Sequence, residues 1–361
     1  MVKQIKSYVS GTRKYVLAFT ILFLAWLILY TVQLLRVRSK IIDQLDRQTT
    51  NYALEHGKVT VKFLSPLKIG INVEDLKLSF SGPAMYKEIP NKKPFKGANS
   101  YFKNVLFTSP LLSKKLNIYV PDEIAFDNGS TNGFIKLVNY SIYIKIGNNS
   151  KFEEIQILAG KVQNRELTPP DSEFLDLVKN FSLLISNDNK TKDQINTAIR
   201  VNIDAIYNRA ENIVLESNFE LIASNTREID EYGNVNSIAI NIEKSNFNDI
   251  ANNFGVDISG NYRVSAYVGA GKADFEFKII NFKSLVNSLN KPNSEFPIFG
   301  KKSINDLVQL LELMPKNPKD TNYDRYYRIT SDLISKKVTV NGVDLNSLLQ
   351  ELFTGGGNSK K

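Results

Sequence analysis

Apolar and polar side chains alternate along most of this chain, beginning with the segment GKVTVKFLSPLKIGINVEDLKLSF at residues 57–80. The apolar positions of this segment are Val59, Val61, Phe63, Leu67, Ile69, Ile71, Val73, Leu76, Leu78 and Phe80. A period of two is typical of β-strands with one wet face, and a turn at Ser65 and Pro66 predicts a hairpin. The apolar positions change from odd to even numbers at Glu74 and Asp75, which predicts a β-bulge or a bend.

The same alternation returns in later runs, which turn residues such as DNGS, GNNS and EYGN separate. These runs are KKLNIYV, GFIKLVNYSIYIKIG, EEIQILAGKVQ, TAIRVNIDAI, NIVLESNFELIAS, VNSIAINIEKS, YRVSAYVGAGKADFEFKII and KKVTV. Antiparallel pairing of neighbours is the economical topology for such runs. We therefore predict a mainly β fold, a β-rich α+β protein with a long twisted antiparallel sheet, a few covering helices and one preceding N-terminal transmembrane helix.

Three segments in the body of the chain have helical spacing of their apolar residues. The first is 174–185, where apolar residues recur at i, i+3, i+4 and i+7 after TPPDSE. The second is 307–314, which follows a capping box and precedes a proline. The third is 345–352, behind an NG turn and a cap at Asp344. We predict that each segment forms a helix that covers the sheet.

A membrane anchor is predicted near the N-terminus, where an uncharged run begins at Tyr15 and ends at Leu35. At about 1.5 Å per residue, a helix of this length spans roughly 30 Å, the hydrocarbon thickness of a bilayer. No small-x-small cleavage site follows the run, so we expect an uncleaved span that binds the lipid bilayer. The cations that flank the run give a slight bias toward a cytoplasmic N-terminus.

Helical spacing continues after the anchor and predicts a stalk that ends at Gly57, with His56 in its last helical turn. The predicted layout is a cytoplasmic N-terminus at 1–14, a transmembrane helix at 15–35, a helical stalk at 36–57, a β-rich domain outside the cytoplasm at 58–353 and a flexible tail at 354–361.

Charge and composition argue against several functions. The formal net charge is +9, but seven cations precede the first acid, Asp43, and the remaining residues carry only about +2. We therefore expect no binding of nucleic acid. The chain has no cysteine and one histidine, so the usual metal sites and catalytic triads lack their residues. The GAGK segment lacks the remainder of a Walker motif. We expect no enzyme activity, no catalytic residue, no metal site and no cofactor.

Two stretches resemble known families. The anchor, the stalk and GKVTVKFLSPLKIGINVEDLKLSF together resemble the start of AsmA-like envelope proteins, in which a strand pair leads into a long sheet curved around a groove. The end, SKKVTVNGVDLNSLLQEL, resembles the final strand, turn and helix of an uncharacterised alphaproteobacterial domain-of-unknown-function family of membrane-anchored periplasmic proteins. The resemblance implies a single-pass protein of the cell inner membrane, with most of the chain in the periplasm, that handles lipid or assists outer-membrane assembly.

Three functions remain open. A sheet that few helices cover offers an apolar groove, in which the protein would bind or move lipid, possible partners being phospholipid or envelope proteins. The candidate residues for the first wall of this groove are Val59, Val61, Phe63, Ile69, Ile71 and Leu78. The alternative is a structural or scaffold protein that binds partner proteins at the membrane through a sheet edge or the basic loop NKKPFK. The third is a membrane-tethered hydrolase.

Overall fold

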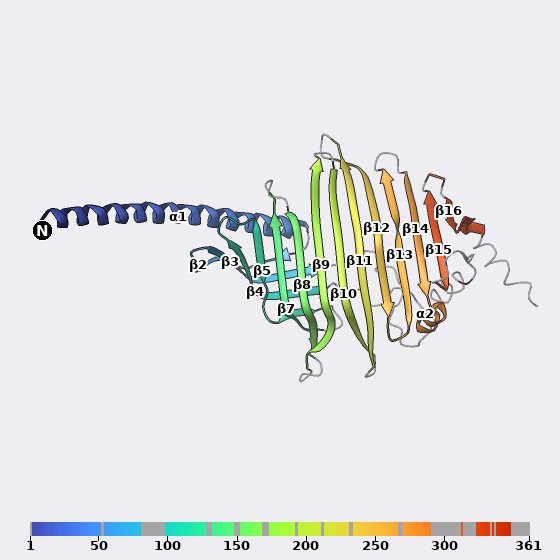
Figure 1. Cartoon of the computed structure of the whole chain (residues 1–361). Helices are drawn as coiled ribbons and strands as arrows, with labels where there is room; N and C mark the ends of the chain where they lie inside the picture. The colour runs from blue at the N-terminus through green and yellow to red at the C-terminus, as the bar shows by residue number, and fades with distance from the viewer. Residues whose placement is uncertain are drawn as a thin grey trace, which may run out of the picture. The chain divides into compact units, whose positions relative to one another are not determined.

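A computed structural model of the chain describes residues 2–51, 54–80, 98–127, 132–147, 152–167, 173–191, 194–210, 213–230, 234–265, 270–289, 312, 323–332, 334–335 and 337–347 (Figure 1). The chain divides into two compact units. The first unit comprises Met1–Lys136, Ile142–Ser150 and Arg165–Glu173. The second comprises Leu137–Ser141, Lys151–Asn164 and Phe174–Lys361.

The protein is mostly β, with one large antiparallel sheet and few helices, as the alternating pattern predicts. The elements of the first unit are α1 (Val2–Asn51), β1 (Leu54–Glu55), β2 (Val59–Ser65), β3 (Lys68–Phe80), β4 (Ala98–Pro110), β5 (Lys115–Tyr119) and β6 (Ile124–Asp127). Two strands, β7 (Asn132–Ile146) and β8 (Phe152–Glu166), contribute residues to both units. The second unit continues with β9 (Leu175–Thr191), β10 (Gln194–Ala210), β11 (Ile213–Ile229), β12 (Val235–Asp249), β13 (Phe254–Ser265), β14 (Gly271–Ile280), α2 (Phe282–Leu289), β15 (Arg325–Asp332), β16 (Lys337–Val340) and β17 (Val343–Asp344).

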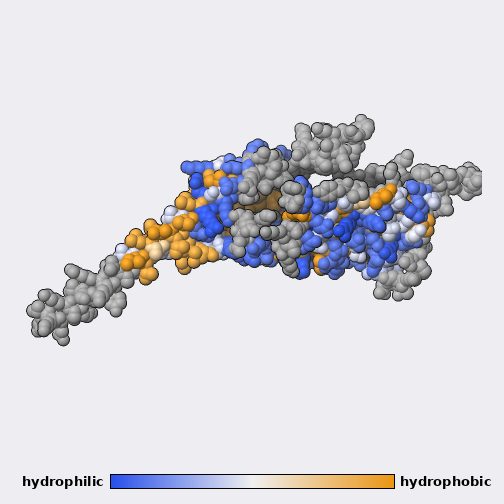
Figure 2. Space-filling model, turned by 90° about the horizontal axis from the view of Figure 1, so that it is seen from above, coloured by the Kyte–Doolittle hydropathy of each residue, from blue (hydrophilic) through white to orange (hydrophobic). Residues whose placement is uncertain are grey.

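The N-terminal helix α1 contains an apolar segment whose side chains are mostly exposed. Its segment Thr20–Asp43 is long and apolar enough to cross a membrane. Figure 2 shows this apolar surface in orange along the helix. Exposed apolar side chains of this density are costly in water, so the composition of the helix fits the interior of a bilayer.

The helix ends earlier than the sequence predicts, and His56 does not lie in its last turn. The final residue of α1 is Asn51, and β1 then pairs with β3, with Leu54 opposite Leu78. His56 follows β1, where its Nδ1 lies 2.9 Å from the carbonyl oxygen of Gly57. Its Nε2 lies 3.5 Å from Asp46 Oδ1. The helical pattern was misleading here, because the backbone at Leu54 already pairs with β3 as a strand and the helix therefore cannot continue to Gly57.

The hairpin and the phase change predicted at the start of the body are confirmed. β2 and β3 pair antiparallel, and their ladder closes with Ser65 opposite Lys68. At the phase change Asp75 has a φ of 49°, a left-handed backbone that aspartate tolerates better than most residues. One such residue reverses the side to which the following side chains point. The apolar residues of β3 therefore stay on one face although their numbering changes from odd to even.

The core of the first unit lies between α1 and the sheet. Its buried residues are Ile41, Leu45, Leu54, Ile71, Val73, Leu76, Val105 and Leu116. Ile41 and Leu45 come from α1, whereas Ile71, Val73 and Leu76 come from β3. The stretch of α1 that follows the predicted span therefore covers the apolar face of β3 and β4.

The second unit is built by strands that pair with their neighbours in chain order, from β8 and β9 through to β16 and β17. The prediction of a helix at 174–185 is wrong, because these residues belong mainly to β9. Its odd-numbered residues Phe181 and Ile185 face apolar partners on both neighbouring strands. The apolar residues of this segment also alternate with a period of two. This alternation decides the structure, because it places apolar side chains opposite those of both neighbouring strands.

A small second core closes the C-terminal end of this unit. It contains Ile279 of β14, Phe282 of α2, Tyr327 of β15 and Val340 of β16. Helix α2 was not predicted, although FKSLVNSL has a helical pattern. The predicted cap at Asp344 is present, since its Oδ1 accepts a hydrogen bond from the Asn346 backbone N–H at 2.8 Å. The predicted helix at 307–314 lies outside the described residues except for 312, as do residues 348–352 of the last predicted helix, the predicted basic loop and the predicted tail.

Candidate functional site

The structure places the six predicted groove residues on the hairpin β2–β3, in two different environments. In the ladder, Val61 stands opposite Ile71 and Phe63 stands opposite Ile69, so these pairs share one face. Val61 is 44% exposed and Phe63 is 66% exposed, whereas Ile69 and Ile71 are both 0% exposed. Val59 and Leu78 are half-buried and pack against the core of the first unit.

Ile69 and Ile71 therefore do not line an open groove, which corrects the prediction for these two residues. Ile71 is buried because α1 packs on it, since Ile41 and Leu45 of α1 belong to the same buried cluster. The sequence pattern shows which side chains of a strand share a face, but it does not show which other element packs on that face. Of the six residues of the predicted wall, two are thus buried, two are half-buried against the core and two are exposed.

The second unit contains a much larger apolar surface, made of successive rows of side chains that run across the strands. Residues directly opposite each other in antiparallel ladders share a face, and the residues two positions along each strand extend that face. The first row is Ile155, Ile185, Ile199, Ala223 and Ile242. The second is Ile157, Leu183, Val201 and Leu221, and the third is Ala159, Phe181, Ile203, Phe219, Phe247 and Val256. We call these three rows the apolar face.

The apolar face is only half-buried. Of its residues, Ala159 is buried and the others have intermediate exposure. This differs from the first unit, where α1 packs on the sheet and Ile71 and Val73 are fully buried. A large apolar surface that keeps partial access to solvent is uncommon on a soluble protein and is typical of a binding surface.

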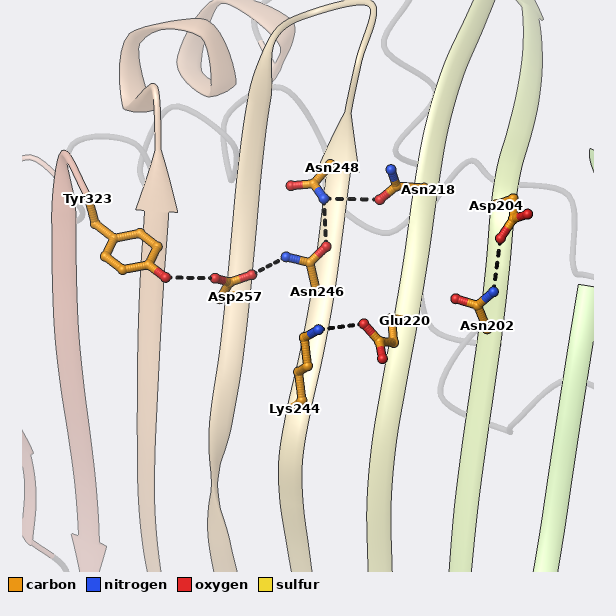
Figure 3. Close-up of polar contacts among 9 residues, drawn as sticks. All are labelled: Asn202, Asp204, Asn218, Glu220, Lys244, Asn246, Asn248, Asp257 and Tyr323. Atoms are coloured by element: carbon orange, nitrogen blue, oxygen red, sulfur yellow. Dashed lines mark hydrogen bonds and ion pairs between the residues drawn. The ribbon is translucent and has the colours of Figure 1, made fainter.

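The opposite face of the same strands is polar and carries a chain of hydrogen bonds (Figure 3). Tyr323 donates to Asp257 at 3.1 Å, and Asp257 also accepts from Asn246. Asn248 donates to Asn246 at 2.6 Å and to Asn218 at 3.0 Å. The sheet is therefore amphipathic, with one face that water solvates well and one that it does not.

Charged side chains also lie on this polar face, where they make an ion pair and hydrogen bonds. On β12, Lys244 Nζ contacts Glu220 Oε2 on β11, and this hydrogen bond raises the pKa of Lys244 (Figure 3). On β10, hydrogen bonds from Asn180 and Asn202 lower the pKa of Asp204. Both shifts favour the charged form, so these two side chains are charged near neutral pH.

No group of three or more His, Cys, Asp or Glu side chains within the described ranges could hold a metal ion. Of the GAGK segment, Gly271 and Lys272 begin β14, and the carbonyl of Ala270 accepts a hydrogen bond from the Ser265 N–H at 2.8 Å. Gly271 and Lys272 pair with Val264 and Arg263 in the ladder between β13 and β14, so these two residues are part of a strand.

No protein-family model, curated protein or solved structure matches this chain. The resemblance to AsmA-like envelope proteins therefore stays a prediction, and the function must be argued from the chain's own residues.

The sequence analysis missed the apolar face as the leading candidate, although it identified several of its strands. The reason is β9, which contributes to all three rows of the face and was predicted to be a helix. The alternation of Phe181, Leu183 and Ile185 was the available signal. It becomes clear only when these residues are compared with Ile199, Val201 and Ile203 of the next strand in the sequence.

Proposed function

We propose that this protein is a single-pass membrane-anchored envelope protein that binds lipid acyl chains on the apolar face of its second unit. The half-buried state of that face carries the proposal, because acyl chains gain free energy when they cover apolar surface that water otherwise contacts. The N-terminal helix supports the membrane setting, since its described part is long and apolar enough to cross a bilayer.

The dimensions of the apolar face suit an acyl chain. Neighbouring strands lie about 4.8 Å apart, so the first row, which crosses five strands, is about 19 Å long. The hydrocarbon of one leaflet is about 15 Å thick, half of the bilayer core. One row can therefore accommodate most of one acyl chain, and three parallel rows offer room for more than one.

We further propose that the anchor lies in the cell inner membrane and that the body lies in the periplasm, the placement that the resemblance to AsmA-like envelope proteins implies. The slight charge bias of the anchor supports the orientation, because it favours a cytoplasmic N-terminus. The full-length protein should then remain in the membrane pellet after carbonate extraction. Protease added from the periplasmic side should degrade the body. Release into the soluble fraction, or protection from external protease in spheroplasts, would contradict this placement.

Two adjacent leucines of β9 provide a matched test of lipid binding. Leu183 belongs to the apolar face, whereas Leu184 points to the opposite face, where it stands opposite Arg200. Wild type, Leu183→Asp and Leu184→Asp would each be purified in full length from membranes supplied with a phospholipid that carries a diazirine on its acyl chain. Crosslinked peptides and copurified lipid would be identified by mass spectrometry.

We expect lipid adducts on peptides of β8 to β12 in the wild type, a several-fold loss of adducts in Leu183→Asp and little loss in Leu184→Asp. Equal adduct yields from the two variants would reject the apolar face as the binding surface. A thermal melt of both variants is the necessary control. If Leu183→Asp alone unfolds at a much lower temperature, the face is part of a closed core and the proposal fails.

A further inference from the structure

The turn between β2 and β3 lies against α1 within the apolar segment of that helix. The indole Nε1 of Trp26 donates a hydrogen bond to the carbonyl oxygen of Pro66 at 2.9 Å. The rings of Tyr30 and Phe63 lie 5.7 Å apart, centroid to centroid. Trp26 precedes Leu35, the end of the uncharged run, by nine residues, or roughly 14 Å along the helix at about 1.5 Å per residue. This turn therefore reaches back along the part of α1 that is predicted to cross the membrane.

The surface beside this contact is apolar and exposed. Leu67 is 68% exposed, and Leu112, in the turn between β4 and β5, is 71% exposed. The two turns are joined by a hydrogen bond of 2.7 Å from the Leu111 N–H to the Leu67 carbonyl. We define the hairpin tip as Phe63, Leu64, Pro66, Leu67 and Leu112, all of which are exposed. Single exposed leucines are ordinary, but a cluster of them next to a membrane helix is a candidate interaction surface.

The backbone of the tip is suited to an environment without water. A lipid leaflet offers no hydrogen-bond partner, so a turn can enter it only if its polar groups are satisfied within the protein. Pro66 has no N–H group, and its carbonyl accepts the hydrogen bond from Trp26. The carbonyl of Leu67 accepts the hydrogen bond from Leu111. Two backbone carbonyls of the turn therefore have their hydrogen-bond partners within the protein.

Lysines border the hairpin tip in the sequence. Lys62 and Lys68 flank the first turn, and Lys114 and Lys115 follow the second. The Lys68 Nζ lies 5.4 Å from the ring centroid of Tyr119. Apolar residues with lysines at their border are typical of membrane interfaces, where the long lysine stems reach the headgroups and their charges attract anionic lipid.

We propose that the hairpin tip inserts into the lipid leaflet on the side of the sheet, next to α1. The membrane contact then has two parts, a helix that crosses the bilayer and a β-turn that enters one leaflet. The continuity of the tip with the apolar segment of α1 favours lipid as its occupant over a second copy of the chain or another protein. This inference is independent of lipid binding by the apolar face of the second unit.

The chain has no cysteine, so single cysteines can report on chosen positions. Leu67→Cys and Leu112→Cys would be labelled with an environment-sensitive fluorophore in the full-length protein. The matched control is Ile334→Cys, since Ile334 is a turn residue of the second unit and is 69% exposed. Each labelled protein would be placed in vesicles of equal parts phosphatidylcholine and phosphatidylglycerol. Quenching by nitroxide-labelled acyl chains would be compared with quenching by iodide in the water.

We expect the labels at Leu67 and Leu112 to emit at shorter wavelength, with several-fold more lipid quenching and several-fold less iodide quenching than the label at Ile334. Iodide quenching equal to that at Ile334 would show that the tip is in water and would overturn the proposal. Protection from both quenchers would show that protein covers the tip and would also overturn it. Unchanged emission of Trp26, the only tryptophan, verifies that each variant keeps the turn against α1.

Discussion

Replacing Ile71 by aspartate tests whether α1 closes the core of the first unit. Ile71 is 0% exposed and packs in the same cluster as Ile41 and Leu45. Truncation of a buried isoleucine to alanine costs about 2–5 kcal/mol, and a buried carboxylate without a partner adds to this cost. We expect Ile71→Asp to lower the free energy of unfolding by at least about 4 kcal/mol, a large part of the total for a typical domain.

Val61→Asp is the matched control, because Val61 stands directly opposite Ile71 on the same face of the hairpin. Val61 is 44% exposed, so its carboxylate can remain hydrated, and the expected cost is about 1 kcal/mol. The two substituted residues occupy neighbouring positions on the same face, but only Ile71 belongs to the buried cluster that includes residues of α1.

The assay is urea unfolding of the full-length protein in mild detergent. Trp26 emission follows the contact between α1 and the hairpin, and circular dichroism follows the sheet. The unfolding midpoint should fall strongly for Ile71→Asp and little for Val61→Asp. Equal shifts would refute the reasoning, because they would mean that α1 does not exclude water from β3. A small shift in the unfolding midpoint of Ile71→Asp would refute the reasoning for the same reason.

Two further predictions concern the second unit. At Gly260, where φ is +148°, the Cβ of an alanine would lie 2.3 Å from the Asp274 carbonyl oxygen. At Gly342 an alanine would be strained by the positive φ, but its Cβ would have no atom within 4 Å. Gly260→Ala should therefore lower the thermal midpoint much more than Gly342→Ala. The hydrogen bond from Arg328 lowers the pKa of Asp274, so this pair stabilises the fold above the carboxyl's ordinary pKa and the contribution is lost as pH falls through the lowered value. In Asp274→Asn this acid-dependent loss, measured by urea unfolding at pH 7 and below pH 4, should be smaller; an unchanged loss would contradict the assignment.

The sequence predicted those features of the fold that depend on local pattern. Alternation identified the strands, and the change from odd to even positions located the left-handed residue Asp75. The uncharged run likewise predicted a long apolar helix. Where two periods fit the same residues, as in 174–185, local pattern was insufficient, because the choice between helix and strand depends on partners on β8 and β10. The difference in burial between Val61 and Ile71 also depends on a neighbour, α1, that the pattern of β2 and β3 does not contain.

The two units show how one kind of strand pattern leads to different surfaces. In the first unit, α1 brings Ile41 and Leu45 onto the sheet, and the apolar residues of β3 become a closed core. In the second unit, the small core around Phe282 and Tyr327 lies at the C-terminal end, and rows of similar residues from β8 to β12 remain half-buried. Hydrophobic burial depends on area removed from water, so the second unit retains free energy that a ligand can still gain. On the opposite face of these strands, polar hydrogen bonds such as that between Asn248 and Asn218 link neighbouring strands. A half-buried apolar face on a sheet whose other face is polar is the property that the proposed binding of lipid requires.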